Sequence, residues 1–134
     1  MKKPSFILDS YALLAFLQGE AGGEQVRDIL KKALNDQAAV FLSVINLGEI
    51  YYIVARKKGR QTAQEILEDM VKLPVEILDA RTERVLAAAD VKARHPLSYA
   101  DAFVAAAAIE FSATIVTGDS KFRAVEARCT VLWI

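Results

Sequence analysis

The sequence contains a single cysteine, Cys129, and a single histidine, His95. A lone cysteine excludes a disulfide bridge within the chain and suits a reducing compartment. A lone histidine excludes a catalytic centre that needs two histidines as general acid and general base. Positive and negative side chains are equal in number, 17 of each, so the chain lacks the basic excess typical of a strong nucleic-acid binder. This balance does not exclude a local basic patch.

Long apolar runs are also missing, and none approaches the length of a membrane-spanning helix. Lys2 and Lys3 precede an apolar stretch, as in a secretory signal, but Asp9 interrupts that stretch at a cost that signal sequences avoid. There is no repeat, linker or low-complexity segment. We therefore expect one domain, residues 1–134, that works in the cytoplasm.

Short apolar runs alternate with helical patterns along the whole chain. The expected strands are residues 6–8, 38–42, 75–78, 114–117 and 130–133. The expected helices are residues 10–17, 24–34, 43–57, 61–71, 82–93 and 98–111, with a short one at 120–125. This alternation predicts an α/β fold in three layers, with helices on both faces of a five-stranded parallel sheet.

The first expected strand ends in an acid, Asp9, and a helix begins at once. In open α/β sheets, ligands bind at the edge formed by the carboxyl ends of the strands. Asp119 occupies a similar place after the fourth strand. Asp101 lies in the first turn of an alanine-rich helix that is apolar all round and must therefore be buried. Taken one at a time, Asp9 and Asp119 are better explained as helix caps, whereas Asp101 is explained equally well as a cap or as a functional acid.

Glu49 differs, because it lies inside a helix. Its neighbours three and four residues away include Ile45, Tyr52 and Ile53, so a carboxylate stands on an apolar face. A buried carboxylate needs a partner, although at the boundary of the core it could instead reach water. Gly48 costs about 1 kcal/mol in a helix interior, which a close backbone approach would explain. We favour a functional role for Glu49.

Carboxylates that converge on one sheet edge repel one another and call for a cation. Carboxylate oxygens suit hard cations, and Mg²⁺ takes one or two carboxylates together with waters and phosphate oxygens. Such a site can activate water and stabilise an in-line displacement at phosphorus. The four acids together therefore indicate a cation-binding site more strongly than any one of them does alone.

The motifs FILDS, SVINLGE, LSYADAFVAAAA and IVTGDSKF follow one another over nearly the whole chain. In order and spacing they resemble those of PIN-domain ribonucleases, most closely the VapC-type toxins of bacterial and archaeal toxin–antitoxin pairs. The residues that match the family's acidic and supporting polar positions are Asp9, Ser10, Glu49, Asp101, Thr117 and Asp119.

The resemblance implies a PIN-like fold with strand order 3-2-1-4-5 and a switch point between strands one and four. It implies a metal-dependent endoribonuclease that uses Mg²⁺ or Mn²⁺, with Asp9, Glu49, Asp101 and Asp119 as catalytic and metal-binding residues. A cognate antitoxin protein and a homodimer are also implied. The apolar stretch Tyr51–Val54 is our candidate for either the antitoxin-binding surface or the dimer surface.

Basic residues near the expected site are candidates for contact with RNA phosphates. Lys121 and Arg123 follow Asp119 closely. Arg56 and Lys57 begin a basic run, although basic residues also commonly end a helix.

Three alternatives remain. One is an RNA-processing PIN nuclease without an antitoxin. Another is a phospho-receiver domain with Asp79 as its phosphorylated residue, but the chain lacks an acid pair after its first strand and a lysine after its last. The third is a non-catalytic binding module, which the loss of an acid would have supported; no acid is lost.

Overall fold

The computed structural model describes residues 2–134. Its elements are β1 (Ser5–Leu8), α1 (Ser10–Leu17), α2 (Gly23–Leu34), β2 (Ala39–Ser43), α3 (Val44–Lys58), α4 (Arg60–Val71), β3 (Glu76–Leu78), α5 (Thr82–Arg94), α6 (Tyr99–Phe111), β4 (Thr114–Thr117), the 3-10 helix η1 (Ser120–Val125) and β5 (Val131–Trp133). The alternation of strands and helices predicted from the sequence is confirmed, with ends that differ by about one residue. No helix within residues 2–134 is long and apolar enough to cross a membrane.

All five strands are parallel, in the order β3-β2-β1-β4-β5, which confirms the predicted sheet. The central strand β1 pairs with β2 on one side and with β4 on the other. The chain therefore winds outward in both directions from β1, and the switch point lies between β1 and β4. Receiver domains have the order 2-1-3-4-5, so the receiver alternative is wrong.

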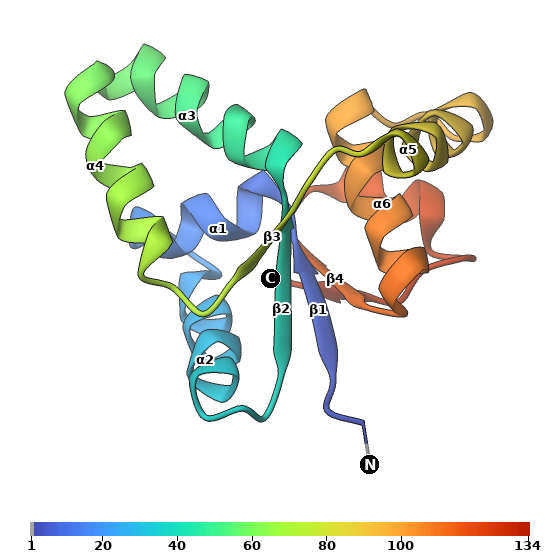
Figure 1. Ribbon diagram of the computed structural model, residues 1–134, viewed down its shortest axis with the longest axis horizontal. Coiled ribbons are helices and arrows are strands. Elements are labelled where there is room, and N and C mark those ends of the chain that lie inside the picture. The colour runs from blue at the N-terminus through green and yellow to red at the C-terminus, as the bar shows by residue number, and fades with distance from the viewer. Residues whose placement is uncertain (1) are drawn as a thin grey trace.

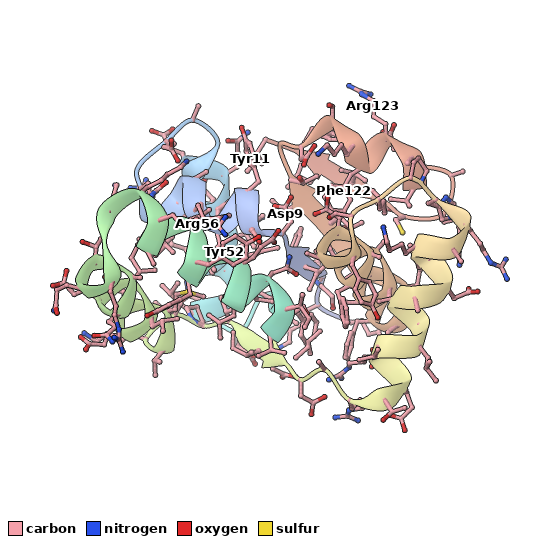
Figure 2. The ribbon with its side chains drawn as sticks, turned by 90° about the horizontal axis from the view of Figure 1, so that it is seen from above. Asp9, Tyr11, Tyr52, Arg56, Phe122 and Arg123 are labelled. Atoms are coloured by element: carbon pink, nitrogen blue, oxygen red, sulfur yellow. The ribbon has the colours of Figure 1, made fainter. Side chains whose placement is uncertain are left out.

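The helices form two layers, with α1 to α4 on one face of the sheet and α5 and α6 on the other (Figure 1). Neighbouring strand residues point to opposite faces, and each layer has its own core. Ile7 and Ile115 belong to the core under α5 and α6, whereas Leu8 and Val116 belong to the core under α1 to α4. Seen from the carboxyl ends of the strands, Asp9 lies between the two layers (Figure 2).

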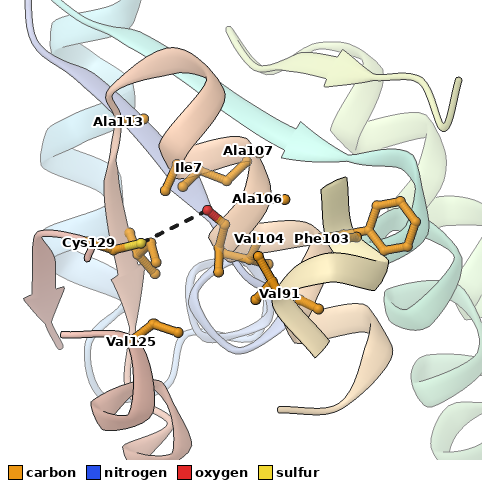
Figure 3. Packing of buried hydrophobic residues seen from close by; sticks show 14 of the residues in the cluster. Ile7, Val91, Phe103, Val104, Ala106, Ala107, Ala113, Val125 and Cys129 are labelled. Atoms are coloured by element: carbon orange, nitrogen blue, oxygen red, sulfur yellow. Dashed lines mark hydrogen bonds between the residues drawn. The ribbon is translucent and has the colours of Figure 1, made fainter. Parts of the chain in front are cut away.

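Helix α6 is the most deeply buried helix of its layer. Every residue from Ala102 to Ala108 is buried, because the helix lies between the sheet and α5. Its alanines allow close packing, and Figure 3 shows Val91 of α5 and Val104 of α6 in this core. The Cys129 thiol, also buried there, donates to the Ala105 carbonyl at 4.0 Å. This packing fixes the N-terminal end of α6, which carries Asp101.

The stretch Tyr51–Val54, our candidate for an antitoxin-binding or dimer surface, is only partly exposed. Val54 is fully buried in the core, whereas Tyr52 is 46% exposed. The expectation is wrong for Val54, because the stretch is helical and only one side of a helix can face solvent.

Candidate functional site

Asp9 is held rigidly at the end of β1. Its Oδ1 accepts a hydrogen bond from the Ala12 amide at 2.8 Å, which makes it the N-cap of α1. Its Oδ2 accepts a hydrogen bond from the Thr117 hydroxyl at the end of β4. The residue is only 2% exposed, so the expected cap is present, but the carboxylate is buried far more deeply than a cap requires.

Thr117 connects the acids on either side of the switch point. While its hydroxyl donates to Asp9, the same oxygen accepts from the Asp119 amide at 2.9 Å. Asp119 in turn caps η1 by accepting from the Lys121 amide at 3.0 Å. The loops after β1 and β4 are therefore fixed relative to each other.

A second set of hydrogen bonds joins α1 to α3. The Ser10 hydroxyl donates to Glu49 Oε1. Asn46 Nδ2 donates to the same Oε1 at 3.1 Å and to Ser10 Oγ at 3.3 Å. These partners fix the orientation of the amide, because a reversed amide would place two acceptor oxygens together.

Asn46 is a residue of the site that the sequence analysis missed. It is fully buried, and its Oδ1 has no hydrogen-bond partner. A signal was present: the amide lies one helical turn before Glu49, on the same otherwise apolar side of α3. Glu49, which is half-buried, thus has two hydrogen-bonded partners, Ser10 and Asn46.

Asp101 reaches the same edge from the other helical layer. Its amide donates to Ser98 Oγ at 3.1 Å, which confirms Ser98 as the cap of α6. Burial raises the pKa of Asp101 above its ordinary value, and the negative charges of Asp119 and Glu49 raise it further. The positive charge of Lys121 opposes this shift, so Lys121 also lies near the site.

The pKa of Asp9 shows that the acids converge. Burial is the largest cause that raises this pKa to about 7. The hydrogen bonds from Thr117 and Ala12 oppose the rise, whereas the charges of Asp101 and Asp119 add to it. We expected repulsion between carboxylates to raise at least one pKa; the direction is confirmed, but desolvation contributes more than repulsion.

The other three basic residues that we expected to contact RNA phosphates have different surroundings. The Arg56 guanidinium stacks 5.0 Å from the centre of the Tyr52 ring on α3. Arg123 stacks 5.0 Å from the centre of the Trp133 ring and lies at the periphery, away from Asp9 (Figure 2). Lys57 lines a groove beside α1, together with Tyr11.

Two interpretations of single residues change. A Cβ on Gly48 would meet no atom within 4 Å, so the close backbone approach that we expected there is wrong. Asp79 is exposed and accepts hydrogen bonds from the guanidinium groups of Arg81 and Arg84. It is therefore neutralised by two cations and takes no part in the acidic site.

The donor set at this edge suits a hard cation, since it consists of carboxylate oxygens and one buried amide oxygen, Asn46 Oδ1, without a partner. No group of three or more Asp, Glu, His or Cys side chains within residues 2–134 lies close enough to hold an ion directly.

Comparison with known proteins identifies one family and several solved structures of similar fold. The family model described as the PIN domain matches residues 6–128. No curated protein matches the chain. A chain in the crystal structure of DNA-bound VapBC from Salmonella typhimurium is 18% identical, with a TM-score of 0.73 and coverage of 96% of this chain and 97% of that one.

Two further structures are similar. A chain of VapBC2 from Rickettsia felis, bound to a DNA fragment from their promoter, is 19% identical over 96% of this chain and 97% of that one, with a TM-score of 0.72. VapC20 from Mycobacterium tuberculosis, a toxin that cleaves the sarcin-ricin loop, is 20% identical over 90% and 94%, with a TM-score of 0.66. At these identities the likeness is one of fold.

Proposed function

The chain belongs to the PIN domain family, and from this premise we propose that it is a metal-dependent endoribonuclease that acts as the toxin of a toxin–antitoxin pair. The observation that carries the proposal is the buried carboxylate of Asp9, within electrostatic reach of Asp101 and Asp119 at the switch point of the sheet. The resemblance to VapC-type toxins and the similar VapBC and VapC folds support the toxin assignment.

The chain's own residues prepare this edge for a phosphodiester. Asp9 is oriented by Ala12 and Thr117, and Glu49 by Ser10 and Asn46, so neither carboxylate has to be ordered when substrate arrives. Asp101 approaches from the opposite layer. A phosphate placed among these acids would be repelled, so the site requires a cation between them.

We assign Asp9, Asp101, Glu49 and Asp119 as the residues that would hold Mg²⁺ or Mn²⁺. The bound ion would supply neutralisation of the phosphate charge and acidification of a water for attack on phosphorus. Asp119 also caps η1, so we expect its contribution to be smaller and to run through water. Lys121 is the basic residue best placed to contact the RNA phosphates.

Cleavage of single-stranded RNA by the purified protein in the presence of Mg²⁺ or Mn²⁺ tests the catalytic proposal. Asp9→Asn, Asp101→Asn and Glu49→Gln should each abolish cleavage and leave the circular dichroism spectrum unchanged. Asp79→Asn is the matched control, because Asp79 also follows a strand but pairs with arginines. An Asp101→Asn protein that cuts at the wild-type rate contradicts the assignment.

The same acidic edge of the sheet suits a cationic side chain from an inhibitor. An antitoxin could lay an amphipathic segment over the helices and place an arginine among the carboxylates, because the planar guanidinium pairs with a carboxylate through two hydrogen bonds. We propose this as the mode of inhibition in the cytoplasm. A neighbouring reading frame that encodes a DNA-binding domain followed by an amphipathic tail would identify the partner.

Binding measurements on that pair separate two kinds of inhibition. Asp9→Asn should lower the affinity for the antitoxin as well as the activity, and replacement of the inserted arginine by alanine should weaken inhibition. Undiminished binding by Asp9→Asn and Asp101→Asn would mean that the antitoxin acts elsewhere and only blocks RNA access. If no such reading frame exists, the RNA-processing nuclease becomes the favoured function.

The family resemblance also leads us to propose a homodimer. Light scattering on the purified protein at several concentrations measures its mass directly. A monomer mass of 14.7 kDa at all concentrations would contradict this part of the proposal.

A further inference from the structure

The side chain of Tyr11 reaches across the switch point of the sheet. Tyr11 lies in the first turn of α1, two residues after Asp9, yet its ring packs against the loop that follows β4. A Cβ on Gly118 would lie 2.5 Å from Tyr11 Cζ and closer still to Cε1, whereas carbon atoms in contact are about 3.5–4.0 Å apart. The ring therefore occupies the space that a side chain at position 118 would need. Figure 2 shows Tyr11 near Asp9.

This ring, rather than the backbone, explains why position 118 is a glycine. Within residues 2–134 the glycines with a positive φ are Gly19, Gly22 and Gly59, so Gly118 has a backbone conformation that alanine can adopt. The three atoms nearest to a Cβ at this position all belong to Tyr11. Glycine in the β4 loop and the aromatic ring on α1 are therefore complementary in shape.

Contacts in the opposite direction join the same two segments. The Thr117 hydroxyl donates to Asp9 Oδ2, and the Asp9 amide donates to the Val116 carbonyl at 3.4 Å. Thr117 thus reaches from β4 to the end of β1, whereas Tyr11 reaches from α1 to the loop after β4. Asp119 is the next residue after the ring contact, so both sets of contacts act on the separation between Asp9 and Asp119.

Repulsion between the acids opposes this separation when no cation is present. The negative charge of Asp119 raises the pKa of Asp9, so the two carboxylates are close enough to repel each other. Asp119 is attached through Gly118, the residue type with the greatest backbone freedom. The Asp119 amide donates to Thr117, and the Tyr11 ring covers Gly118 itself. The ring therefore restrains the loop at the residue that restrains itself least.

We propose that Tyr11 is a positioning residue of the acidic site: by packing on Gly118 it holds Asp119 at the separation from Asp9 that a divalent cation requires. The inference rests on the proposed metal-dependent function and adds a residue outside the four acids. Tyr11 is 46% exposed, and replacement of so exposed a side chain usually has little effect. Its role comes from where the ring makes contact, not from how deeply it is buried.

Melting temperatures at increasing Mn²⁺ concentrations give the dissociation constant of the ion for each variant. Tyr11→Ala should raise this constant about tenfold, because residues that orient metal ligands have effects of this size. Tyr11→Phe keeps the ring carbons against Gly118 and should bind Mn²⁺ like the wild type. RNA cleavage should follow the same order, with Tyr11→Ala needing about ten times more Mn²⁺ for half of its maximal rate.

Gly118→Ala tests the other side of the contact. The new Cβ displaces the Tyr11 ring, so this variant should lose Mn²⁺ affinity as Tyr11→Ala does. A double variant with both substitutions should bind Mn²⁺ no more weakly than either single variant, because both remove the same contact. If the two residues acted independently, their effects on the dissociation constant would multiply to about a hundredfold, and that result would overturn the inference.

Val26→Ala separates positioning from a general loss of stability. Val26 is fully buried in α2, which carries none of the site residues. Its replacement should lower the melting temperature of the metal-free protein and leave the Mn²⁺ dissociation constant unchanged. A loss of Mn²⁺ affinity in Val26→Ala as large as in Tyr11→Ala would show that any destabilisation weakens the site, which excludes a specific role for Tyr11.

Failure of this inference and failure of the proposed function give different results. Wild-type Mn²⁺ affinity in Tyr11→Ala, together with affinity that still depends on Asp9, removes Tyr11 from the site and leaves the proposed function intact. A wild-type protein that neither binds Mn²⁺ nor cleaves RNA overturns both.

Discussion

At the scale of single residues, the four acids could be singled out from the sequence, because each follows a strand, opens an apolar helix or interrupts one. The hydrogen bonds that orient them were not. Thr117 and Ser10 were identified only through the family motifs, and Asn46 was missed, because a pattern of residue types does not tell which polar side chains meet across two helices. The contact between Asn46 and Ser10 spans 36 positions in the chain.

Asn46→Leu tests whether the buried amide positions Glu49. Leucine has a similar volume and removes the unpartnered buried Oδ1, but it also removes the hydrogen bonds that Nδ2 donates to Glu49 and Ser10, so the melting temperature should stay the same or fall slightly. The RNA cleavage rate should fall about tenfold, because residues that orient metal ligands have effects of this size. Asn46→Leu with full cleavage activity would show that Ser10 alone is sufficient to orient Glu49.

The pKa of Asp9 predicts an unusual pH dependence for the metal-free protein. Folding raises this pKa from 3.8 to about 7, so the folded state binds the proton more tightly than the unfolded state does. The free energy of unfolding should therefore increase as the pH falls from about 7 towards about 4, by up to roughly 4 kcal/mol. Urea unfolding in EDTA at several pH values measures this.

Asp9→Asn is the control for that measurement. Asparagine can still cap α1 but does not ionise, so the variant should lose most of the pH dependence and exceed the wild type in stability at pH 8. The same slope in both proteins would show that Asp9 is not the group responsible.

At the scale of elements, the period of the hydrophobic residues and the capping residues predicted the ends of the helices and strands to within about one residue. Ser43 and Ser98 cap α3 and α6 as predicted. The surroundings of Gly48 could not be predicted in this way. The sequence shows that a glycine inside a helix is costly, but it does not show which atoms lie near that glycine. The structure shows open space at this position, next to Glu49.

Gly48→Ala should stabilise the protein by about 1 kcal/mol, because alanine has the higher helix propensity and its Cβ meets no atom. Thermal unfolding of the variant in EDTA measures the gain. A lower melting temperature would mean that α3 is not regular around Gly48. A stabilised variant with impaired RNA cleavage would show that substrate needs the open space beside Glu49.

At the scale of the whole molecule, periodicity predicted the three layers and the parallel sheet, whereas the strand order came only from the family resemblance. Nothing in a strand's own residues specifies its neighbours in an α/β sheet, since all five strands are short and apolar. The order matters for the proposed function, because it puts β1 next to β4 and thereby brings Asp9 within electrostatic reach of Asp119. The two helical layers then contribute Glu49 and Asp101 from opposite sides.

The central claim is that these acids together form a binding site for a divalent cation. The most direct test is the melting temperature of the protein with and without Mn²⁺, because a ligand bound only by the folded state stabilises it. At one hundred times the dissociation constant the wild type and Asp79→Asn should gain about 5–10 °C. Asp9→Asn and Asp101→Asn should gain little or nothing. Equal gains in all four proteins, or none in the wild type, would contradict the account.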